Sequence, residues 1–427
     1  MRLLKYSDPD YQKVLDRLVN RSDVDFQAQD QTVRDIIERV KREGDAALVA
    51  LTNQFDQTDY QVEDLRVTQE EIQQAYDTIK LEELEALKLA ADNIGRYHQK
   101  QVQHSWEYKE GEVYLGQMIR PLATVGVYVP GGKASYPSSV LMNAVPARVA
   151  GVKRVVMVSP TPRREVSPHC LVAADIAGVD EIYKIGGAQA VAALALGTET
   201  VPRVDKIVGP GNIYVALAKR LVFGLVDIDM IAGPSEILVL ADDSARADFI
   251  AADLLSQAEH DEDAVPILVT PSEALAEATR EELNRQKAGL SRESIVNASL
   301  ENKCLLIVTR TLDEAVDLAN RLAPEHLELA VENPHELVKR IDNAGAIFLG
   351  HFTPEAIGDY LAGPNHVLPT SGTARFSSPL GVYDFIKRTS LISYSKEELD
   401  RAAHACCTLA EMENLEAHSK AVKVRIS

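Results

Sequence analysis

From about residue 123 onward, short apolar runs rich in β-branched residues alternate with longer stretches of helical periodicity. Apolar runs of this length are typical of buried strands, and helical stretches between them predict parallel strands joined by crossover helices. The first series has four such runs, at 124–129, 154–158, 181–185 and 205–208, with helical stretches at 139–150 and 189–196. This series predicts a doubly wound parallel sheet.

A second series of apolar runs follows residue 235, again with helical stretches between the runs. Its candidate strands are 237–241, 266–270, 305–309, 327–331 and 346–349. Two series of this kind predict an α/β protein with two Rossmann-like, doubly wound domains.

The two ends of the chain have a different pattern. Residues 1–22 predict a short helical arm that ends at the polar stretch N-R-S-D. Beyond residue 381 we expect no further strands, and 396–420 predicts a polar helical tail with too few apolar residues for a core of its own, which we expect to pack on another surface such as that of a partner subunit. The expected parts are 1–22, 23–127 with 235–380, 128–234, and 381–427.

The composition is that of a globular protein, and the charge is strongly negative. Of the 427 residues, 46% are hydrophobic and 26% are charged, and 45 Lys and Arg against 64 Asp and Glu give a formal net charge of −19. Nucleic acids and anionic membranes attract positive surfaces, so this balance argues against both as partners.

The N-terminal segment and the cysteines indicate the compartment. Lys5, Asp8 and Asp10 interrupt the first residues, so we expect neither a signal peptide nor a transmembrane span. The four cysteines have no C-x-x-C spacing, which fits a reducing compartment. Cys406 and Cys407 are adjacent, and we favour two small buried residues of a helix over a redox pair. The sequence thus predicts a cytoplasmic protein.

Residue types that bind metal ions are scattered over the second half of the chain. Gln257 and His260 end the helical stretch 245–260, and their spacing places both side chains on one face of its last turn. An imidazole nitrogen and an amide oxygen so placed can bind one ion. Taken alone, a buried and hydrogen-bonded Gln and His at a helix end is the better interpretation.

Glu325 and His326 supply two bases of different strength just before the apolar run 327–331. Neighbouring residues of a strand point to opposite faces, so the two serve one site only if they lie in an irregular turn before the strand. The alternative is a surface glutamate beside a partly buried histidine. By itself the pair is weak support for a catalytic site.

Asp359 precedes His366 by seven positions, and Gly363 and Pro364 force a loop between them. A carboxylate and an imidazole brought together in this way suit a zinc ligand and the group that supports it. His418 is on the polar tail, where an isolated histidine is more often solvated. His418 is a candidate ligand only because the chain also contains the other candidate ligands.

Two glycine-rich turns of the first series are similar to phosphate-binding loops. G-V-Y-V-P-G-G covers 126–132, and G-P-G-N covers 209–212, between a candidate strand and a helix. Neither is a complete G-x-G-x-x-G, since Tyr214 stands where the last glycine of the second would fall. Both can present backbone N–H groups and a helix N-terminus to a pyrophosphate, and tight turns without a ligand are the alternative.

Together these segments resemble the histidinol dehydrogenase family. In chain order they are G-V-Y-V-P-G-G, G-G-A-Q-A, G-P-G-N, A-G-P-S-E, S-Q-A-E-H, L-A-P-E-H-L and G-P-N-H-V-L-P-T, and the resemblance covers nearly the whole chain. It implies oxidation of L-histidinol through L-histidinaldehyde to L-histidine, the last step of histidine biosynthesis. It also implies zinc and two NAD per turnover, because each NAD accepts two of the four electrons.

The resemblance implies roles for individual residues. The zinc ligands would be Gln257, His260, Asp359 and His418. The catalytic pair would be Glu325, which activates water for attack on the aldehyde, and His326, which takes the alcohol proton. The NAD contacts would be Tyr128, Gln189 and Asn212. Besides His326 and the zinc ligands, the substrate contacts would be Ser235, His366 and Glu413.

The resemblance further implies a homodimer with shared active sites. In this family the C-terminal tail crosses to the other subunit, so that His418 would complete the neighbour's zinc site. The unit of 23–127 with 235–380 would carry the zinc and catalytic residues, and 128–234 the NAD-binding loops. The implied partners are L-histidinol, NAD and a second copy of the chain.

Three alternatives remain. A zinc hydrolase could use Glu325 as its water-activating base, but it has no use for two dinucleotide-type loops. A dehydrogenase of another small amino alcohol or diol on the same fold is the nearer rival. Glu413 and His418 argue against it, since they resemble the family's amino-alcohol contacts. A non-catalytic metal-binding scaffold leaves Glu325 and His326 without a role.

Overall fold

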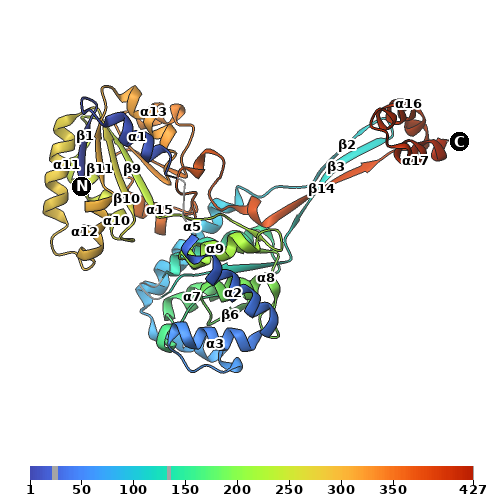
Figure 1. Ribbon diagram of the computed structural model, residues 1–427, viewed down its shortest axis with the longest axis horizontal. Helices are drawn as coiled ribbons and strands as arrows, with labels where there is room; N and C mark the ends of the chain where they lie inside the picture. Colours follow the sequence, from blue (N-terminus) through green and yellow to red (C-terminus); the bar gives the residue numbers. More distant parts are fainter. Residues whose placement is uncertain (22–26, 132–135, 427) are drawn as a thin grey trace.

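The computed structural model describes residues 1–21, 27–131 and 136–426. Figure 1 shows three parts: a six-stranded sheet with its helices, a five-stranded sheet with its helices, and a long antiparallel arm that projects from them. Both larger sheets are parallel and covered by helices, which confirms the predicted fold class of two doubly wound α/β units.

The six-stranded sheet has the order β1-β11-β10-β9-β12-β13, and every neighbouring pair is parallel. Its strands are β1 (Arg2–Lys5), β9 (Glu236–Ala241), β10 (Val265–Thr270), β11 (Leu305–Val308), β12 (His326–Ala330) and β13 (Ala346–Leu349). Alternate residues of β9 enter the hydrophobic clusters on the two faces of the sheet. One face is covered by α10 (Ala247–Ala258), α11 (Glu273–Gln286) and α12 (Glu293–Asn302), and the other by α1 (Tyr11–Val19), α13 (Leu312–Leu322) and α14 (Pro334–Leu337).

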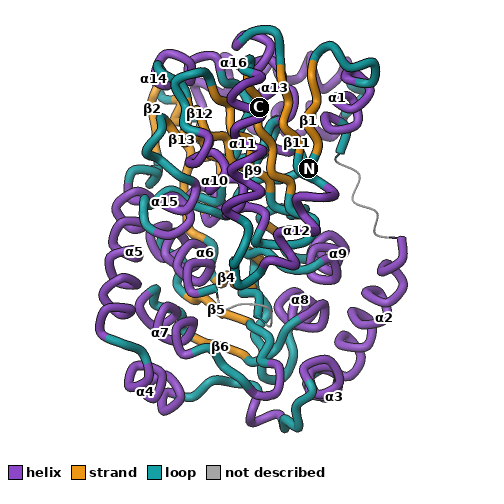
Figure 2. Tube along the Cα trace, turned by 90° about the vertical axis from the view of Figure 1, so that its left-hand side faces the viewer, coloured by secondary structure: helices purple, strands orange, loops and turns teal. Residues whose placement is uncertain are grey.

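The five-stranded sheet has the order β6-β5-β4-β7-β8 and is also parallel. Its strands are β4 (Thr124–Tyr128), β5 (Arg154–Val158), β6 (Glu181–Tyr183), β7 (Lys206–Val208) and β8 (Asp227–Ile228). One face packs on α2 (Gln27–Glu43), α3 (Asp45–Asp56), α8 (Gly187–Leu196) and α9 (Ile213–Val222). The other packs on α4 (Gln69–Thr78), α5 (Leu81–Gln99), α6 (Pro137–Ala150) and α7 (Pro168–Ile176). Figure 2 shows the two helix layers on opposite sides of this sheet.

The arm is an antiparallel ribbon of β2 (Trp106–Glu110), β3 (Val113–Pro121) and β14 (Ile386–Ser393), in the order β14-β3-β2. All eight residues of β14 pair with β3. The ribbon leads to α16 (Lys396–Met412) and α17 (Glu416–Ile426), which Figure 1 shows far from both parallel sheets. The arm is therefore built from two segments that are far apart in the sequence.

The structure corrects three expectations about the ends of the chain. Residues 1–22 do not form only a helical arm, because β1 precedes α1 and pairs with β11 at the edge of the six-stranded sheet. Strands do not stop at residue 381, since β14 follows it. The helices α2 to α5 pack on the five-stranded sheet, whereas the expected grouping placed 23–127 with 235–380. Residues 22–26, at the first expected boundary, lie outside the described residues.

The physical reason for the different grouping is visible in the packing of α2. Its apolar stripe of Val33, Ile36 and Val40 shares a hydrophobic cluster with the alanine-rich helix α8. A stripe of this kind shows that a helix has a buried face, but it does not show which sheet the helix packs on.

None of the helices that the structure describes is both long and apolar enough to span a bilayer.

Candidate active site

A group of buried polar residues lies at the amino ends of β9 and β12. His326 is the first residue of β12, and Glu236 is the first residue of β9. The loop that follows α15 (Glu355–Tyr360) contacts the five-stranded unit, because Asn365 Nδ2 donates to Met142 O of α6 at 2.6 Å. The group is therefore located where the two α/β units meet.

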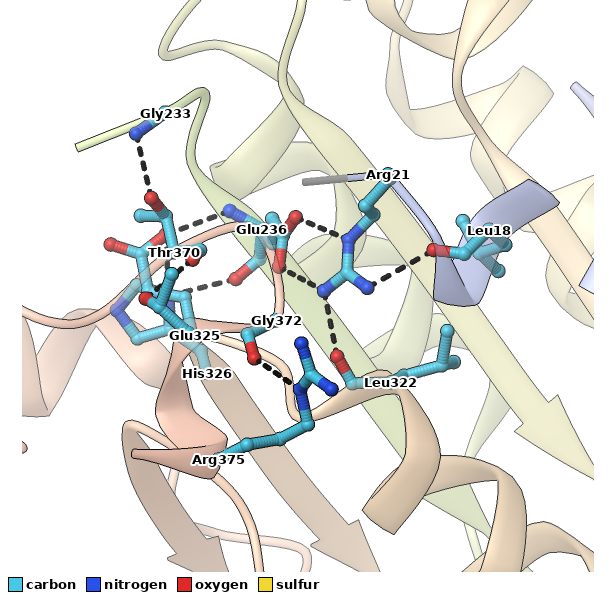
Figure 3. A network of polar contacts seen from close by, with 11 residues as sticks. Leu18, Arg21, Gly233, Glu236, Leu322, Glu325, His326, Thr370, Gly372 and Arg375 are labelled. Atoms are coloured by element: carbon cyan, nitrogen blue, oxygen red, sulfur yellow. Dashed lines mark hydrogen bonds and ion pairs between the residues drawn. The ribbon is translucent and has the colours of Figure 1, made fainter. Parts of the chain in front are cut away.

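Glu236 holds Glu325 and His326 through its main chain. Its N–H donates to Glu325 Oε2 at 2.8 Å, and its carbonyl oxygen lies 2.9 Å from His326 Nδ1. Figure 3 shows both contacts converging on this one residue. Glu325 precedes the strand and His326 begins it, so the two side chains lie on the same site, with 3.7 Å between His326 Nδ1 and Glu325 Oε2.

Two further carboxylates, both from α15, approach the same imidazole. Glu355 Oε1 is 3.5 Å from His326 Nδ1, and Asp359 Oδ1 is 3.7 Å from Nε2. The spacing of Glu355 and Asp359 places both on one face of the helix. With Nδ1 directed at Glu236 O, the ring presents Nε2, which has no hydrogen-bond partner, toward Asp359.

Burial and charge shift the titration of these groups. Burial lowers the pKa of His326, but the carboxylates of Glu355, Glu325 and Asp359 outweigh this effect and raise it well above the usual value. Burial raises the pKa of Glu325 to about 8, although His326 opposes the shift. Burial likewise raises the pKa of Glu355 to about 7. Carboxyl groups that titrate near neutral pH are typical of acid–base catalysis.

Asp359 and His366 are joined through the loop that the sequence predicted. His366 Nδ1 is 3.0 Å from Asp359 O, and His366 Nε2 is 3.4 Å from Ser139 Oγ of α6. Burial works to raise the pKa of Asp359, but the nearby imidazoles of His326, His366 and His260 lower it below the usual value. Asp359 is therefore an anion over the neutral pH range.

Gln257 lies in the last turn of α10, and His260 lies in the turn that follows the helix, beside this group. Gln257 is fully buried, and neither its amide oxygen nor its amide nitrogen has a hydrogen-bond partner. Burial lowers the pKa of His260, which favours the neutral imidazole. A buried amide without a partner is costly, so a cation bound to the amide oxygen of Gln257 would remove part of that cost.

The structure places one predicted metal ligand, Asp359, in a cluster that could hold a metal ion, and His260 is close enough to Asp359 for the two to interact electrostatically. Of the residues described, His326, Glu355 and Asp359 offer ligand atoms within 4.8 Å of one another, and Asp359 alone belongs to the ligand set expected from the sequence. His418 is exposed on α17, and Glu413 is exposed at the end of α16. Both lie at the end of the arm, so one chain does not bring them to the site (Figure 1).

The predicted cofactor residues lie at the carboxyl edge of the five-stranded sheet. Tyr128 ends β4, and its buried hydroxyl accepts the N–H of Gly187 at 3.1 Å. Gln189 is buried on α8, and its Oε1 has no partner. Asn212 caps α9 by accepting the N–H groups of Tyr214 and Val215. Gly132, which ends the first glycine loop, lies outside the described residues.

The G-P-G-N loop is held from below by a buried ion pair. Lys219 Nζ donates to Gly209 O at 2.9 Å and pairs with Asp229, while Asp229 Oδ2 accepts the N–H of Gly209 at 2.7 Å. Gly209 has φ +110°, and a Cβ there would lie 2.1 Å from Tyr128 O. Only glycine fits this position. The two predicted cofactor loops are therefore in close contact at Gly209 and Tyr128.

Glu236 and Glu355 were not among the site residues expected from the sequence. Ser235, which was expected, directly precedes Glu236. Ser235 is partly buried just before β9, and its carbonyl accepts the N–H of Val265 at 2.9 Å. One signal for Glu355 was available, since it precedes Asp359 by one helical turn. The role of Glu236 comes from its main chain, for which no side-chain pattern provides a signal.

Comparisons with known proteins show which family this chain is similar to. The family model described as histidinol dehydrogenase matches residues 19–426. The histidinol dehydrogenase of Syntrophotalea carbinolica is 56% identical over 100% of this chain and 99% of its own, and that of Geobacter sulfurreducens is 56% identical over 100% of both. The crystal structure of histidinol dehydrogenase from Elizabethkingia anophelis, 36% identical, superposes with a TM-score of 0.94 over 100% of this chain and 98% of that one.

A family model that matches almost the whole chain and full-length relatives of this identity leave no room for a partial or local likeness. The similarity of the solved structure extends over the arm as well as the two α/β units, because the whole chain is covered. The chain belongs to the histidinol dehydrogenase family, whose members are oxidoreductases of histidine biosynthesis.

Proposed function

We propose that this chain is a zinc-dependent enzyme that oxidises L-histidinol through L-histidinaldehyde to L-histidine with two NAD per turnover. The observation that carries the proposal is the buried pair of Glu325 and His326, both held by Glu236 beside Asp359. It places an imidazole and a carboxyl group with a pKa of about 8 at one point, next to donors that suit a metal ion.

Gln257, His260 and Asp359 are the zinc ligands that one chain would supply. The unpartnered amide of Gln257, the neutral imidazole of His260 and the anionic carboxylate of Asp359 support this choice. When bound, zinc would hold the amine and the imidazole of histidinol in place and would take no part in electron transfer. His366, held by Asp359 O and Ser139, and Ser235 would contact the substrate beside it.

His326 is the base that takes the alcohol proton. Its Nδ1 is engaged by Glu236 O, which leaves Nε2 free to accept. In the protein without a cation, the surrounding carboxylates raise the pKa of His326. A cation held by Asp359 offsets one of these negative charges, so it lowers the pKa of His326 toward the range in which the imidazole acts as a base.

Glu325 is the group that activates water for attack on the aldehyde. Its pKa of about 8 matches a base that works near neutral pH, and Glu236 N–H fixes one of its oxygens. The water oxygen bonds to the aldehyde carbon while Glu325 takes one proton of the water, which gives the hydrate as its anion. The second oxidation removes a hydride from that carbon. The two bases therefore serve two successive steps at one substrate position.

Tyr128, Gln189 and Asn212 are the NAD contacts that we propose. Their support is their place at the carboxyl edge of a doubly wound sheet, where dinucleotides bind in this architecture. The unpartnered Oε1 of Gln189 and the helix start capped by Asn212 are suitable polar partners. Bound NAD would accept a hydride from the substrate carbon in each of the two oxidations.

We propose that a second copy of the chain completes each site. Glu413 and His418 lie at the end of the arm, far from both α/β units of the same chain. Several apolar side chains near them are exposed. Those on α16, α17 and the turn between them are Leu409, Met412, Leu415 and Val424. In a homodimer, the partner's arm would bring Glu413 and His418 to the substrate and the zinc ion.

The test is NADH formation from L-histidinol by the purified, zinc-loaded protein, with the product analysed. We expect two NADH for each L-histidine formed. Amide or peptide cleavage without NADH would identify a zinc hydrolase instead. If small diols or amino alcohols that lack an imidazole are turned over as fast as histidinol, the protein is instead a dehydrogenase of such alcohols.

A further inference from the structure

Arg21 forms a buried ion pair with Glu236, behind the catalytic pair (Figure 3). Arg21 Nε and Nη2 each lie 2.6 Å from an oxygen of the Glu236 carboxylate, in a two-pronged arrangement. The side chains are 13% and 3% exposed. The remaining donors of the guanidinium reach Leu18 O at 3.1 Å and Leu322 O at 2.9 Å, so Arg21 is fixed from three sides.

The main chain of Glu236 is the part that contacts the catalytic residues. Its N–H holds Glu325, and its carbonyl holds His326 Nδ1. Glu236 is the first residue of β9, and it pairs in register with Val265 of β10, whereas the pairing of β9 with β12 starts one residue later, at Ile237. The end of a ladder constrains a residue less than its middle. An anchored side chain supplies the missing constraint.

We propose that the Arg21–Glu236 ion pair is a positioning device for the reaction. By fixing the Glu236 side chain, it fixes the direction of the Glu236 N–H and C=O, and through them the carboxyl of Glu325 and the Nδ1–H form of His326. Nε2 of His326 is thereby aimed at the Asp359 side of the site. The inference rests on the proposed function, because Glu325 and His326 are catalytic only in that reaction.

A segment near the N-terminus thus controls chemistry that it does not touch. Arg21 follows α1, which packs on the opposite face of the sheet from α10, the helix that carries Gln257. The Arg21 guanidinium donates to Glu236, Leu18 and Leu322, and to neither catalytic residue. Its ion pair acts on the reaction through Glu236, whose main-chain contacts stay chemically intact when the side chains of the pair are changed.

The decisive variant is Arg21→Met with Glu236→Met, which removes both charges and so leaves no lone buried charge. We expect kcat with histidinol to fall about 10- to 100-fold, with the KM for NAD and the zinc content unchanged. Arg21→Lys keeps the charge and loses the two-pronged contact, so its loss of kcat should be smaller. Glu236→Gln keeps one hydrogen bond to Arg21 and serves as a second milder variant.

Lys206→Met is the matched control. Lys206 is 6% exposed and pairs with Asp227 at 2.9 Å and with Asp384 at 3.7 Å. It begins β7 of the other sheet, whereas the proposed NAD loop follows the opposite end of that strand. It removes a buried cation of similar burial, so it reports the cost of that loss to the fold as a whole. We expect kcat within about twofold of the wild type, as for a substitution remote from the reaction.

Two kinetic results would overturn the inference. The first is a folded double variant with wild-type kcat. The second is a loss of kcat that Lys206→Met reproduces at equal loss of thermal stability. If the wild type itself forms no NADH, the proposed function fails, and crystal structures of wild type and double variant decide the inference alone. A His326 Nδ1 contact to Glu236 O that is unchanged in the variant overturns it, and a lengthened one supports it.

Discussion

At the scale of single residues, the site is marked by negative charge crowded around one imidazole. Three carboxylates lie within 3.7 Å of the ring nitrogens of His326, in a buried environment. Repulsion between like charges is strong where water is excluded. His326 relieves part of it, and a cation bound by Asp359 would relieve more. Groups with shifted pKa values therefore gather at one point, as is typical of active sites.

His326→Ala should slow the first oxidation by about 10²- to 10⁴-fold, because it removes the base that takes the alcohol proton. Zinc should remain bound, since His326 is not among the proposed ligands. Single-turnover kinetics with metal analysis checks both points, and His335→Ala, at an exposed position of α14, is the control. A zinc content that falls in step with the rate would contradict the role given to His326.

Gln257→Leu should have opposite effects in the two states of the protein. Without metal, it removes a buried amide that has no hydrogen-bond partner, so the free energy of unfolding should rise by about 1–2 kcal/mol. With zinc, it removes a ligand, so the zinc affinity should fall at least about tenfold. Urea unfolding with and without a chelator measures the first effect, and competition with a chelating dye measures the second. Destabilisation in both states would contradict the proposed ligand.

Glu325 should make the metal-free protein less stable as the pH rises. Its ordinary pKa of 4.5 is raised to about 8 in the folded state, first of all by burial. Between these values the unfolded chain has lost a proton that the folded chain still binds, so rising pH favours unfolding by up to about 1.4 kcal/mol per pH unit. Glu325→Gln has no such proton. Urea midpoints of the two proteins should therefore diverge across this window and run parallel below it.

Sequence reasoning found the side chains that carry recognisable chemistry. Spacing made Gln257, His260, Asp359 and His366 candidates, and the family resemblance supplied their roles. The structure places His260, Asp359 and His366 near one another. No sequence pattern pointed to Glu236, because Glu236 contacts the catalytic pair through its main-chain N–H and C=O. These contacts depend on strand register, which no local pattern of side chains encodes.

At the scale of elements, periodicity was informative wherever an element has a buried face. The apolar runs predicted β4 to β7 and β9 to β13 within a few residues of their bounds, because every one of these strands lies in a sheet covered on both faces. The arm gave no such signal. All five residues of β2 are exposed, and none of the eight residues of β14 is buried. A ribbon without a core has no apolar alternation to detect.

Gly209→Ala should weaken NAD binding and lower stability. The substitution places a Cβ 2.1 Å from Tyr128 O at φ +110°, so the G-P-G-N loop must move away from β4. Gly224→Ala is the matched control, because φ is +100° and nothing lies within 4 Å of the added carbon. Both variants should lose about 1–3 kcal/mol to backbone strain, and only Gly209→Ala should also raise the KM for NAD. Equal KM values would contradict a cofactor role for this loop.

At the scale of the whole molecule, the proposed ligand His418 is separated from the others by the length of the arm. Figure 1 shows α17 beyond the end of the ribbon, while α10 and α15 lie against the six-stranded sheet. β14 is paired with β3 along its whole length, so the arm extends α16 and α17 away from both parallel sheets. A site that contains both Gln257 and His418 therefore needs two chains.

Mixing His418→Ala subunits with His326→Ala subunits should restore activity. Each hybrid dimer has one site in which both changes meet and one site with neither, so random exchange should give about a quarter of wild-type activity. Assays before and after subunit exchange, with hybrids isolated by two different tags, measure the recovery. Hybrids that form and remain inactive would place the whole site within one chain.

The antiparallel arm also has a consequence for the making of the protein. β14 begins about 265 residues after β3 ends, so the hairpin of β2 and β3 waits without its third strand while that chain is synthesised. At roughly 5–20 residues per second the wait is on the order of ten to fifty seconds. In the proposed homodimer, a ribosome must therefore almost finish a chain before that chain can contribute to its neighbour's chemistry. A chain that terminated just before the tail would keep its own site residues and disable the neighbour's site.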